Sequence, residues 1–204
     1  MDKNINIAII GLGQVGNFLY NELKIKKNEI QNKTGKKIQI VAISAKNRNK
    51  KRRFKIENKI FYSNPLTIFK EKKIDILFEC IGLSDGISKK IVETALEKKI
   101  HVITPNKTLL AKHGDYLAKL AEKNNVCLEF EASVAGGIPI IRTIKEGLAT
   151  NKINKVYGIL NGTTNYILTE MEKTGETFDK VLKKAQQLGY AEPGNPKLDL
   201  NGFD

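Results

Sequence analysis

The sequence has 204 residues, of which 41% are hydrophobic and 28% charged, a balance typical of a folded globular protein rather than a disordered one. No apolar run approaches the roughly 20 residues of a membrane span, and no secretory signal is visible at the N-terminus. The two cysteines, Cys80 and Cys127, lie in separate apolar, strand-like runs, which excludes a disulfide framework. We therefore expect a cytoplasmic protein.

The net charge of +13 is concentrated near the N-terminus. Residues 1–60 carry 15 Lys and Arg against 4 Asp and Glu, whereas residues 61–204 carry 20 against 18. Seven of the ten residues in 46–55 are basic, a pattern that also occurs in nucleic-acid binders, because clustered cations displace counterions from phosphates. The alternative is a compositional bias, since Lys, Ile and Asn together make up 76 residues. We favour this alternative and expect neither a nucleic-acid nor a membrane partner.

The first 45 residues predict a strand, a glycine-rich turn, a helix and a second strand. Residues 5–10 form a β-branched run of strand length, and the turn 11–16 (GLGQVG) follows directly. Apolar residues then recur at helical spacing, at Val15, Leu19 and Leu23. The pattern fades in the polar stretch 26–37, and 38–44 (IQIVAIS) is nearly all apolar, as in a parallel strand covered on both faces.

Strands and helices continue to alternate along the chain. After a polar loop over 46–59, strands are predicted over 74–80, 101–104 and 126–132, and helices over 84–98, with Ser84 as N-cap, and 108–124. This order predicts an α/β fold over residues 1–135, a doubly wound parallel sheet of the Rossmann type. Beyond it, helices are predicted over 136–148, near 165–173 and over 178–188, with one strand over 155–160. We interpret residues 136–204 as an incomplete α+β domain for substrate binding and dimerisation.

The glycine-rich turn has the spacing of a dinucleotide-binding motif. Gly11 permits the tight turn, Gly13 lets the backbone approach a pyrophosphate, and Gly16 lets the helix pack on the strand. The amino end of the helix adds N–H groups for the phosphates. The alternative is a tight turn with a structural role only. We expect cofactor contacts from the whole turn, Gly11, Leu12, Gly13, Gln14, Val15 and Gly16.

The end of the second strand predicts which nucleotide binds. A carboxylate there would accept from the ribose 2′-OH of NAD, whereas a cation accommodates the 2′-phosphate of NADP. The sequence continues as Ala45-Lys46-Asn47-Arg48, with no carboxylate before Glu57. We therefore predict NADP, with NAD as the alternative, and contacts from Ala45, Lys46 and Arg48, although both cations could belong to a solvated loop. Further contacts are expected from Ile81 and Gly82.

Four longer motifs, in this order, resemble the homoserine dehydrogenase family: 106–107 (NK), 131–139 (EASVAGGIP), 158–166 (GILNGTTNY) and 188–193 (LGYAEP). The resemblance covers essentially the whole chain. It implies NAD(P)H-dependent reduction of L-aspartate 4-semialdehyde to L-homoserine, on the way to threonine and methionine. It also implies a homodimer of the complete protein.

The resemblance assigns catalytic and substrate-binding roles. Lys107 would lie beside the nicotinamide and the substrate, where hydride transfer leaves an alkoxide that needs positive charge and a proton donor. Glu192 and Asp204 resemble the carboxylates that hold the substrate ammonium group or position the lysine, and Asp199 would support them. One residue more than the usual pattern separates Glu192 from Asp204, which leaves Asp199 open. A pocket contribution is expected from Gly162, Thr163 and Thr164, although Thr164 or Asn165 could simply cap the following helix.

The resemblance also implies a monovalent-cation site, with sodium as the ion. One carboxylate and main-chain carbonyls would supply oxygen ligands, at Glu131, Val134, Gly136 and Ile138. The alternative is an ordinary strand-to-helix turn. A zinc site is not expected, because His101 and His113 lack a Cys or His partner at ligand spacing. Cys80 is expected in the core.

The sequence ends before the substrate-binding pattern of the family is complete. In the family, the favoured proton donor to the alkoxide is a lysine four residues beyond the position of Asp204, where this chain ends. We therefore expect a fragment or a shortened gene product. The alternative to an active enzyme is a non-catalytic dinucleotide-binding module of the same family.

Overall fold

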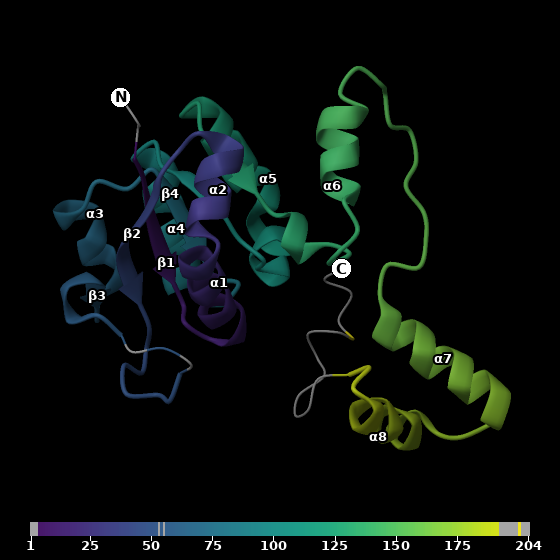
Figure 1. Ribbon diagram of the computed structural model, residues 1–204. Coiled ribbons are helices and arrows are strands. Elements are labelled where there is room, and N and C mark those ends of the chain that lie inside the picture. Colours follow the sequence, from purple (N-terminus) through teal and green to yellow (C-terminus); the bar gives the residue numbers. More distant parts are fainter. Residues whose placement is uncertain (1–3, 53, 55, 192–199, 201–204) are drawn as a thin grey trace. The chain divides into compact units, whose positions relative to one another are not determined.

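The structure is a computed structural model that describes residues 4–52, 54, 56–191 and 200 (Figure 1). It divides into two compact units, Met1–Ser133 and Val134–Asp204. In the described part of the chain, every helix is too short or too polar to cross a membrane. Each unit is described by itself.

The described residues of the first unit form a six-stranded sheet in the order β3-β2-β1-β4-β5-β6, in which all paired strands are parallel. The strands are β1 (Ile5–Ile10), β2 (Ile38–Ser44), β3 (Phe61–Tyr62), β4 (Ile76–Glu79), β5 (His101–Ile103) and β6 (Leu128–Glu129). This order is that of doubly wound dinucleotide-binding folds and confirms the predicted Rossmann-type sheet. The direction of winding reverses between β1 and β4, so the crevice typical of such folds is expected at the carboxyl ends of these two strands.

Helices cover both faces of the sheet (Figure 1). They are α1 (Gln14–Ile25), α2 (Lys27–Thr34), α3 (Ile68–Glu71), α4 (Ile87–Glu97) and α5 (Lys107–Lys123). Side chains of β1 alternate between two core clusters, as strand geometry requires. Ile7 and Ile9 belong to the cluster that contains Tyr20 of α1, whereas Ala8 and Ile10 belong to the cluster that contains the buried residues of α4 and α5. Burial on both faces explains why the strand is a continuous apolar run.

Several predicted boundaries in this unit are wrong. The polar stretch after α1 forms α2. Of the predicted apolar stripe on α1, Leu19 and Leu23 pack against the core beside the buried Tyr20, whereas Val15 is 52% exposed. Helix α4 begins at Ile87 with Gly86 at its N-cap, because the Ser84 hydroxyl instead donates to Asp85. The last strand spans only Leu128–Glu129, so Cys127 lies before it and is exposed.

The regular elements in the described part of the second unit are helices, joined by loops. The elements are α6 (Ile140–Arg142), a π-helical turn (Thr143–Gly147), α7 (Gly162–Thr174) and α8 (Phe178–Leu188). Helices α7 and α8 pack through Ile167, Val181 and Ala185. The predicted strand over 155–160 is wrong, because no described strand pairs with it and Tyr157 is 84% exposed. A strand without a partner leaves its backbone groups to water.

Candidate functional site

The glycine-rich turn between β1 and α1 is shaped by close backbone packing at two of its glycines. Gly11 has φ +94°, and a Cβ built there would lie 2.5 Å from the carbonyl carbon and oxygen of Cys80. A Cβ at Gly16 would lie 1.9 Å from the carbonyl oxygen of Gly11. Gly13 differs, because nothing lies within 4 Å of its Cβ position. The turn therefore leaves open space at the one glycine that the motif predicts to face the ligand.

The amino end of α1 suits a phosphate. Gly13 occupies its N-cap without a side-chain hydrogen bond, and the first turn contains no acidic residue. The first N–H groups of this helix therefore have no side-chain acceptor at the cap, and the helix dipole favours an anion there. Gln14 and Val15 are exposed beside Gly13, whereas Leu12 is buried in the core. Leu12 can therefore contribute to a ligand site only through its backbone.

The loop after β2 is held by its own arginines. The Arg48 guanidinium donates to Asn58 Oδ1 and lies 5.1 Å from the centre of the Phe61 ring. Arg52 donates to the carbonyl oxygens of Asn47, Arg48 and Lys50 at 2.6–2.9 Å. Lys46 is exposed, and Ala45 is half-buried at the strand end. Arg52 therefore organises the backbone around Arg48.

A hydrogen-bond network around Glu79 joins the carboxyl ends of β4 and β5. Glu79 is completely buried, and its Oε1 accepts from the backbone N–H of Ile81 at 2.8 Å and of Gly82 at 3.4 Å. Its Oε2 accepts from the Thr104 hydroxyl at 2.7 Å and from the Asn106 side-chain amide at 3.2 Å. Two of the predicted cofactor residues thus receive their backbone positions from a carboxylate that the sequence motifs did not single out.

Lys107 is the first residue of α5 and is held there by the Asn106 cap. The Asn106 side-chain oxygen accepts from the Leu109 N–H at 3.1 Å and from the Thr108 hydroxyl at 2.9 Å. The Asn106 side-chain amide also donates to the Leu83 carbonyl oxygen at 2.9 Å. Lys107 is half-buried, at the same edge of the sheet as the glycine-rich turn. The fold therefore brings together the predicted pyrophosphate turn and the predicted catalytic lysine.

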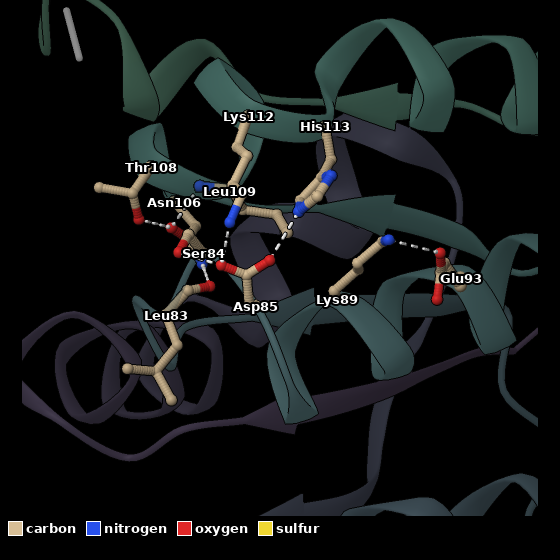
Figure 2. A network of polar contacts seen from close by, with 10 residues as sticks. All are labelled: Leu83, Ser84, Asp85, Lys89, Glu93, Asn106, Thr108, Leu109, Lys112 and His113. Atoms are coloured by element: carbon tan, nitrogen blue, oxygen red, sulfur yellow. Dashed lines mark hydrogen bonds and ion pairs between the residues drawn. The ribbon is translucent and has the colours of Figure 1, made fainter.

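A second polar network anchors the loop before α4 to the face of α5 (Figure 2). Asp85 accepts from Lys112 Nζ at 2.7 Å and from the Ser84 hydroxyl at 2.8 Å, and its other oxygen lies 2.9 Å from His113 Nε2. The hydrogen bonds from Lys112, His113 and Ser84 hold the pKa of the Asp85 carboxyl well below its usual range. His113 therefore contacts a carboxylate rather than a metal ligand set.

The Asp85 network gives a testable pH dependence. A carboxyl group whose pKa is lowered in the folded protein stabilises it at neutral pH, and this contribution is lost as the pH falls through the folded-state pKa. Asp85→Asn should therefore lower the urea midpoint by a constant amount above about pH 5, and the difference should shrink toward about pH 3. Urea unfolding of both proteins between these limits measures it. An unchanged difference at pH 3 would contradict the lowered pKa.

Cys80 has no nucleophilic role in this arrangement. Burial, with a smaller contribution from the adjacent Glu79 charge, raises the pKa of its thiol to about 12. The thiol is therefore protonated at neutral pH, and the reactive form of cysteine is the thiolate. The side chain is half-buried, so the expectation that Cys80 lies in the core is wrong. Cys127 lies elsewhere, and its backbone N–H donates to His101 Nδ1 at 3.1 Å.

Two surface cavities share Lys24, Glu57 and Lys59, and no residue of the glycine-rich turn lines either of them. The second is also lined by Asn58, the hydrogen-bond partner of Arg48. The first is lined by Ile38 at the amino end of β2, whereas the predicted nucleotide contacts follow the carboxyl end of the same strand. Lys24 and Glu57 form an ion pair at 3.1 Å across the cavity rim. Neither cavity coincides with the edge of the sheet where the glycine-rich turn lies.

The predicted residues of the second unit are only partly within the described chain. The Thr163 hydroxyl donates to the Tyr190 carbonyl oxygen at 2.6 Å, and Gly162 begins α7. Asn161 caps this helix, with its Oδ1 accepting from the Thr164 N–H at 2.7 Å, so the expectation of a cap at Thr164 or Asn165 is wrong. Glu192, Asp199 and Asp204 lie outside the described residues.

The predicted cation ligands fall on both sides of the division between the units. Glu131 begins a 3-10 turn (Glu131–Ser133) that closes the first unit. Val134, Gly136 and Ile138 belong to the second unit, where the Ile138 N–H donates to the Ala135 carbonyl oxygen at 2.8 Å. The cation site therefore stays a prediction from the sequence.

Comparison with known proteins gives consistent matches. A family model described as "Homoserine dehydrogenase, NAD binding domain" matches residues 11–131, and one described as "Homoserine dehydrogenase" matches residues 139–204. The homoserine dehydrogenases of Neisseria gonorrhoeae and Bacillus subtilis are 43% and 37% identical over 202 residues. Each alignment covers 99% of this chain and 46% of the relative. The chain thus spans about half the length of the curated relatives it matches.

Solved structures give the same result. A crystal structure of a homoserine dehydrogenase from Thiobacillus denitrificans has a TM-score of 0.79 and 37% identity, over 97% of this chain and 45% of that one. A hyperthermophilic archaeal homoserine dehydrogenase mutant in complex with NADPH has a TM-score of 0.75 and 25% identity, over 96% of this chain and 64% of that one.

Proposed function

The chain belongs to the homoserine dehydrogenase family, and on that premise we propose that it binds NADPH and serves the reduction of L-aspartate 4-semialdehyde to L-homoserine. The observation that carries the proposal is the strand order, which brings the glycine-rich turn and Lys107 to the same edge of one parallel sheet. Ligands of such sheets bind at the carboxyl ends of the strands, at the point where the strand order reverses.

The residues of the turn fit a dinucleotide. The open space at Gly13 and the amino end of α1 accommodate a pyrophosphate, and neither would be needed for packing alone. The reduced nicotinamide ring supplies a hydride for the aldehyde carbon. Lys107 would place positive charge beside the carbonyl oxygen, where negative charge develops as the aldehyde is reduced. Ile81 and Gly82 would line the nicotinamide side of the site.

The preference for NADPH follows from the cations after β2. We expect NADPH to bind more tightly than NADH, because Arg48 is already oriented by Asn58 and Phe61 and can donate to a 2′-phosphate. Replacing Lys46 and Arg48 together with alanine should reduce the ratio of the NADH and NADPH dissociation constants by about 10- to 100-fold. This is the loss expected when charge-assisted hydrogen bonds to the 2′-phosphate are removed. Calorimetric titration of both cofactors measures it. Tighter binding of NADH by the unmodified protein would contradict the proposal.

A matched control comes from the same loop. Lys50 and Lys51 are exposed, and replacing both with alanine removes the same charge without touching Arg48 or its partners. If this control narrowed the NADPH preference equally, the effect would come from the net charge of the loop and not from Lys46 and Arg48.

We also propose the substrate, cation and subunit contacts that membership of the family implies. Glu192 and Asp204 would hold the substrate ammonium group, with Asp199 beside them, and the Thr163–Thr164 segment would border the pocket. Glu131, with carbonyl groups of Val134, Gly136 and Ile138, would bind sodium, and the complete protein would form a homodimer. Semialdehyde-dependent oxidation of NADPH tests the activity. NADPH binding without any such oxidation would support the alternative, a non-catalytic dinucleotide-binding module.

A further inference from the structure

We infer that Glu79 is a positioning residue that fixes the nicotinamide side of the site by holding the 81–83 loop and the amino end of α5 together. The identity of the ligand rests on the proposed function, whereas the hydrogen bonds of Glu79 do not depend on that proposal. Glu79 is completely buried and is the last residue of β4, directly before Cys80, whose backbone packs against Gly11.

The donors around Glu79 come from two segments that are distant in the sequence. The N–H groups of Ile81 and Gly82 belong to the loop after β4, whereas the Thr104 hydroxyl and the Asn106 amide belong to the connection between β5 and α5. A buried carboxylate is costly unless hydrogen bonds compensate it, and here four donors do so. Removing the carboxylate therefore loosens the two segments, which keep the hydrogen bond from the Asn106 amide to the Leu83 carbonyl oxygen.

The Asn106 side chain connects Glu79 to α5, because it bonds the carboxylate and also caps the helix. Its amide group bonds both Glu79 and the Leu83 carbonyl oxygen, and its oxygen caps the helix at Leu109. All the hydrogen-bonding positions of the amide group and the cap are thus used, so Asn106 cannot rotate without losing bonds. Lys107 follows directly in the chain, and its direction from the helix depends on this cap.

The position of the network determines which part of a dinucleotide it affects. In a doubly wound sheet each half binds one mononucleotide, and the adenosine half is read at the end of β2. Glu79, Thr104 and Asn106 lie in the other half, at the ends of β4 and β5. The network should therefore affect the nicotinamide half of the ligand and leave the adenosine half unaffected.

Glu79→Gln tests the inference because glutamine keeps the size of the side chain but replaces one acceptor oxygen with an NH₂ group. The NH₂ group faces either the Asn106 amide or the N–H groups of Ile81 and Gly82. In both arrangements one hydrogen-bond donor points at another, so a hydrogen bond is lost. NADPH affinity should fall about tenfold or more, the loss expected for a charge-assisted hydrogen bond. The affinity for 2′-phospho-ADP-ribose, which lacks the nicotinamide, should stay unchanged. A merely structural role would weaken both ligands equally.

Amide hydrogen exchange supplies a measurement that needs no ligand. In Glu79→Gln, exchange should accelerate at Ile81, Gly82 and Leu109 and stay unchanged at the amides of α1. Adding Asn106→Asp should restore slow exchange at Leu109, because a carboxylate at position 106 accepts from the NH₂ group introduced at position 79 and still caps α5. It cannot donate to the Leu83 carbonyl oxygen, so that bond is not restored. Glu97→Gln, an exposed change on α4, is the control. If Glu79→Gln does not fold, Thr104→Val removes one donor and should give the same pattern, more weakly.

The outcomes separate the two claims. Equal losses for both ligands, or an acceleration of exchange throughout the first unit, would overturn the positioning role. If the unmodified protein bound neither ligand, the proposed function would fail, and the exchange of Ile81, Gly82 and Leu109 would still decide whether Glu79 holds these segments together.

Discussion

Replacing Gly16 with alanine should unfold the first unit, whereas replacing Gly13 with alanine should leave it folded and weaken cofactor binding. The Cβ at position 16 would lie 1.9 Å from the Gly11 carbonyl oxygen, which is backbone and cannot move aside as a side chain would. We expect a loss of more than about 3 kcal/mol in the free energy of unfolding, since overpacking of this kind already costs about 1–3 kcal/mol when side chains can adjust.

The Gly13 variant is the matched partner of this experiment. Its φ of −72° suits alanine, and its Cβ would meet nothing within 4 Å, so stability should change by less than about 1 kcal/mol. The same methyl group would occupy the space proposed for the pyrophosphate and should weaken NADPH binding about 10- to 100-fold. Urea unfolding and NADPH titration of both variants provide the measurements. Equal urea midpoints for the two would contradict the packing argument.

The central strands could be predicted from the sequence because they are buried on both faces. Residues 5–10 and 38–44 are nearly all apolar, and the structure places both inside the sheet. The edge strand β3 could not be predicted, since it contains only Phe61 and Tyr62 and is defined by its pairing with Ile43 and Ser44. A two-residue strand has no periodicity of its own.

Residues 155–160 show the opposite error. Val156, Tyr157 and Ile159 have high β propensity, yet their side chains are 67–84% exposed and no described strand lies beside them. Propensity describes how well a residue fits a pleated and half-buried surface, and it cannot supply the neighbouring strand. The sequence pattern therefore predicted a strand for which the described residues provide no partner.

The candidate site was predictable where one short segment contains all of its parts. The glycine-rich turn is such a segment, because its three glycines and the following helix are contiguous. The Glu79 network is not, since Thr104 and Asn106 lie 25 and 27 residues farther along the chain. In the sequence, Glu79 is an acidic residue at the end of an apolar run. Only this position could have indicated that its carboxylate is buried and hydrogen-bonded.

Lys107 occupies a position that is electrostatically unfavourable for the helix it begins. It is the first residue of α5, the first turn contains no acidic residue, and the positive end of a helix dipole disfavours a cation by about 0.3–1 kcal/mol. Positive charge at this place is consistent with a role in binding negative charge that develops on a substrate.

Lys107→Met should accordingly lower the rate of semialdehyde reduction about 100- to 1,000-fold, the range measured when one donor to a developing oxyanion is removed. NADPH should still bind, because the glycine-rich turn is untouched. Lys119→Met is the control, since it makes the same change on an exposed face of α5, where Lys119 pairs with Asp115. Binding of homoserine to the NADP complex gives a second readout, and it should weaken only in Lys107→Met. Equal behaviour of the two variants in both measurements would mean that Lys107 does not act on the substrate.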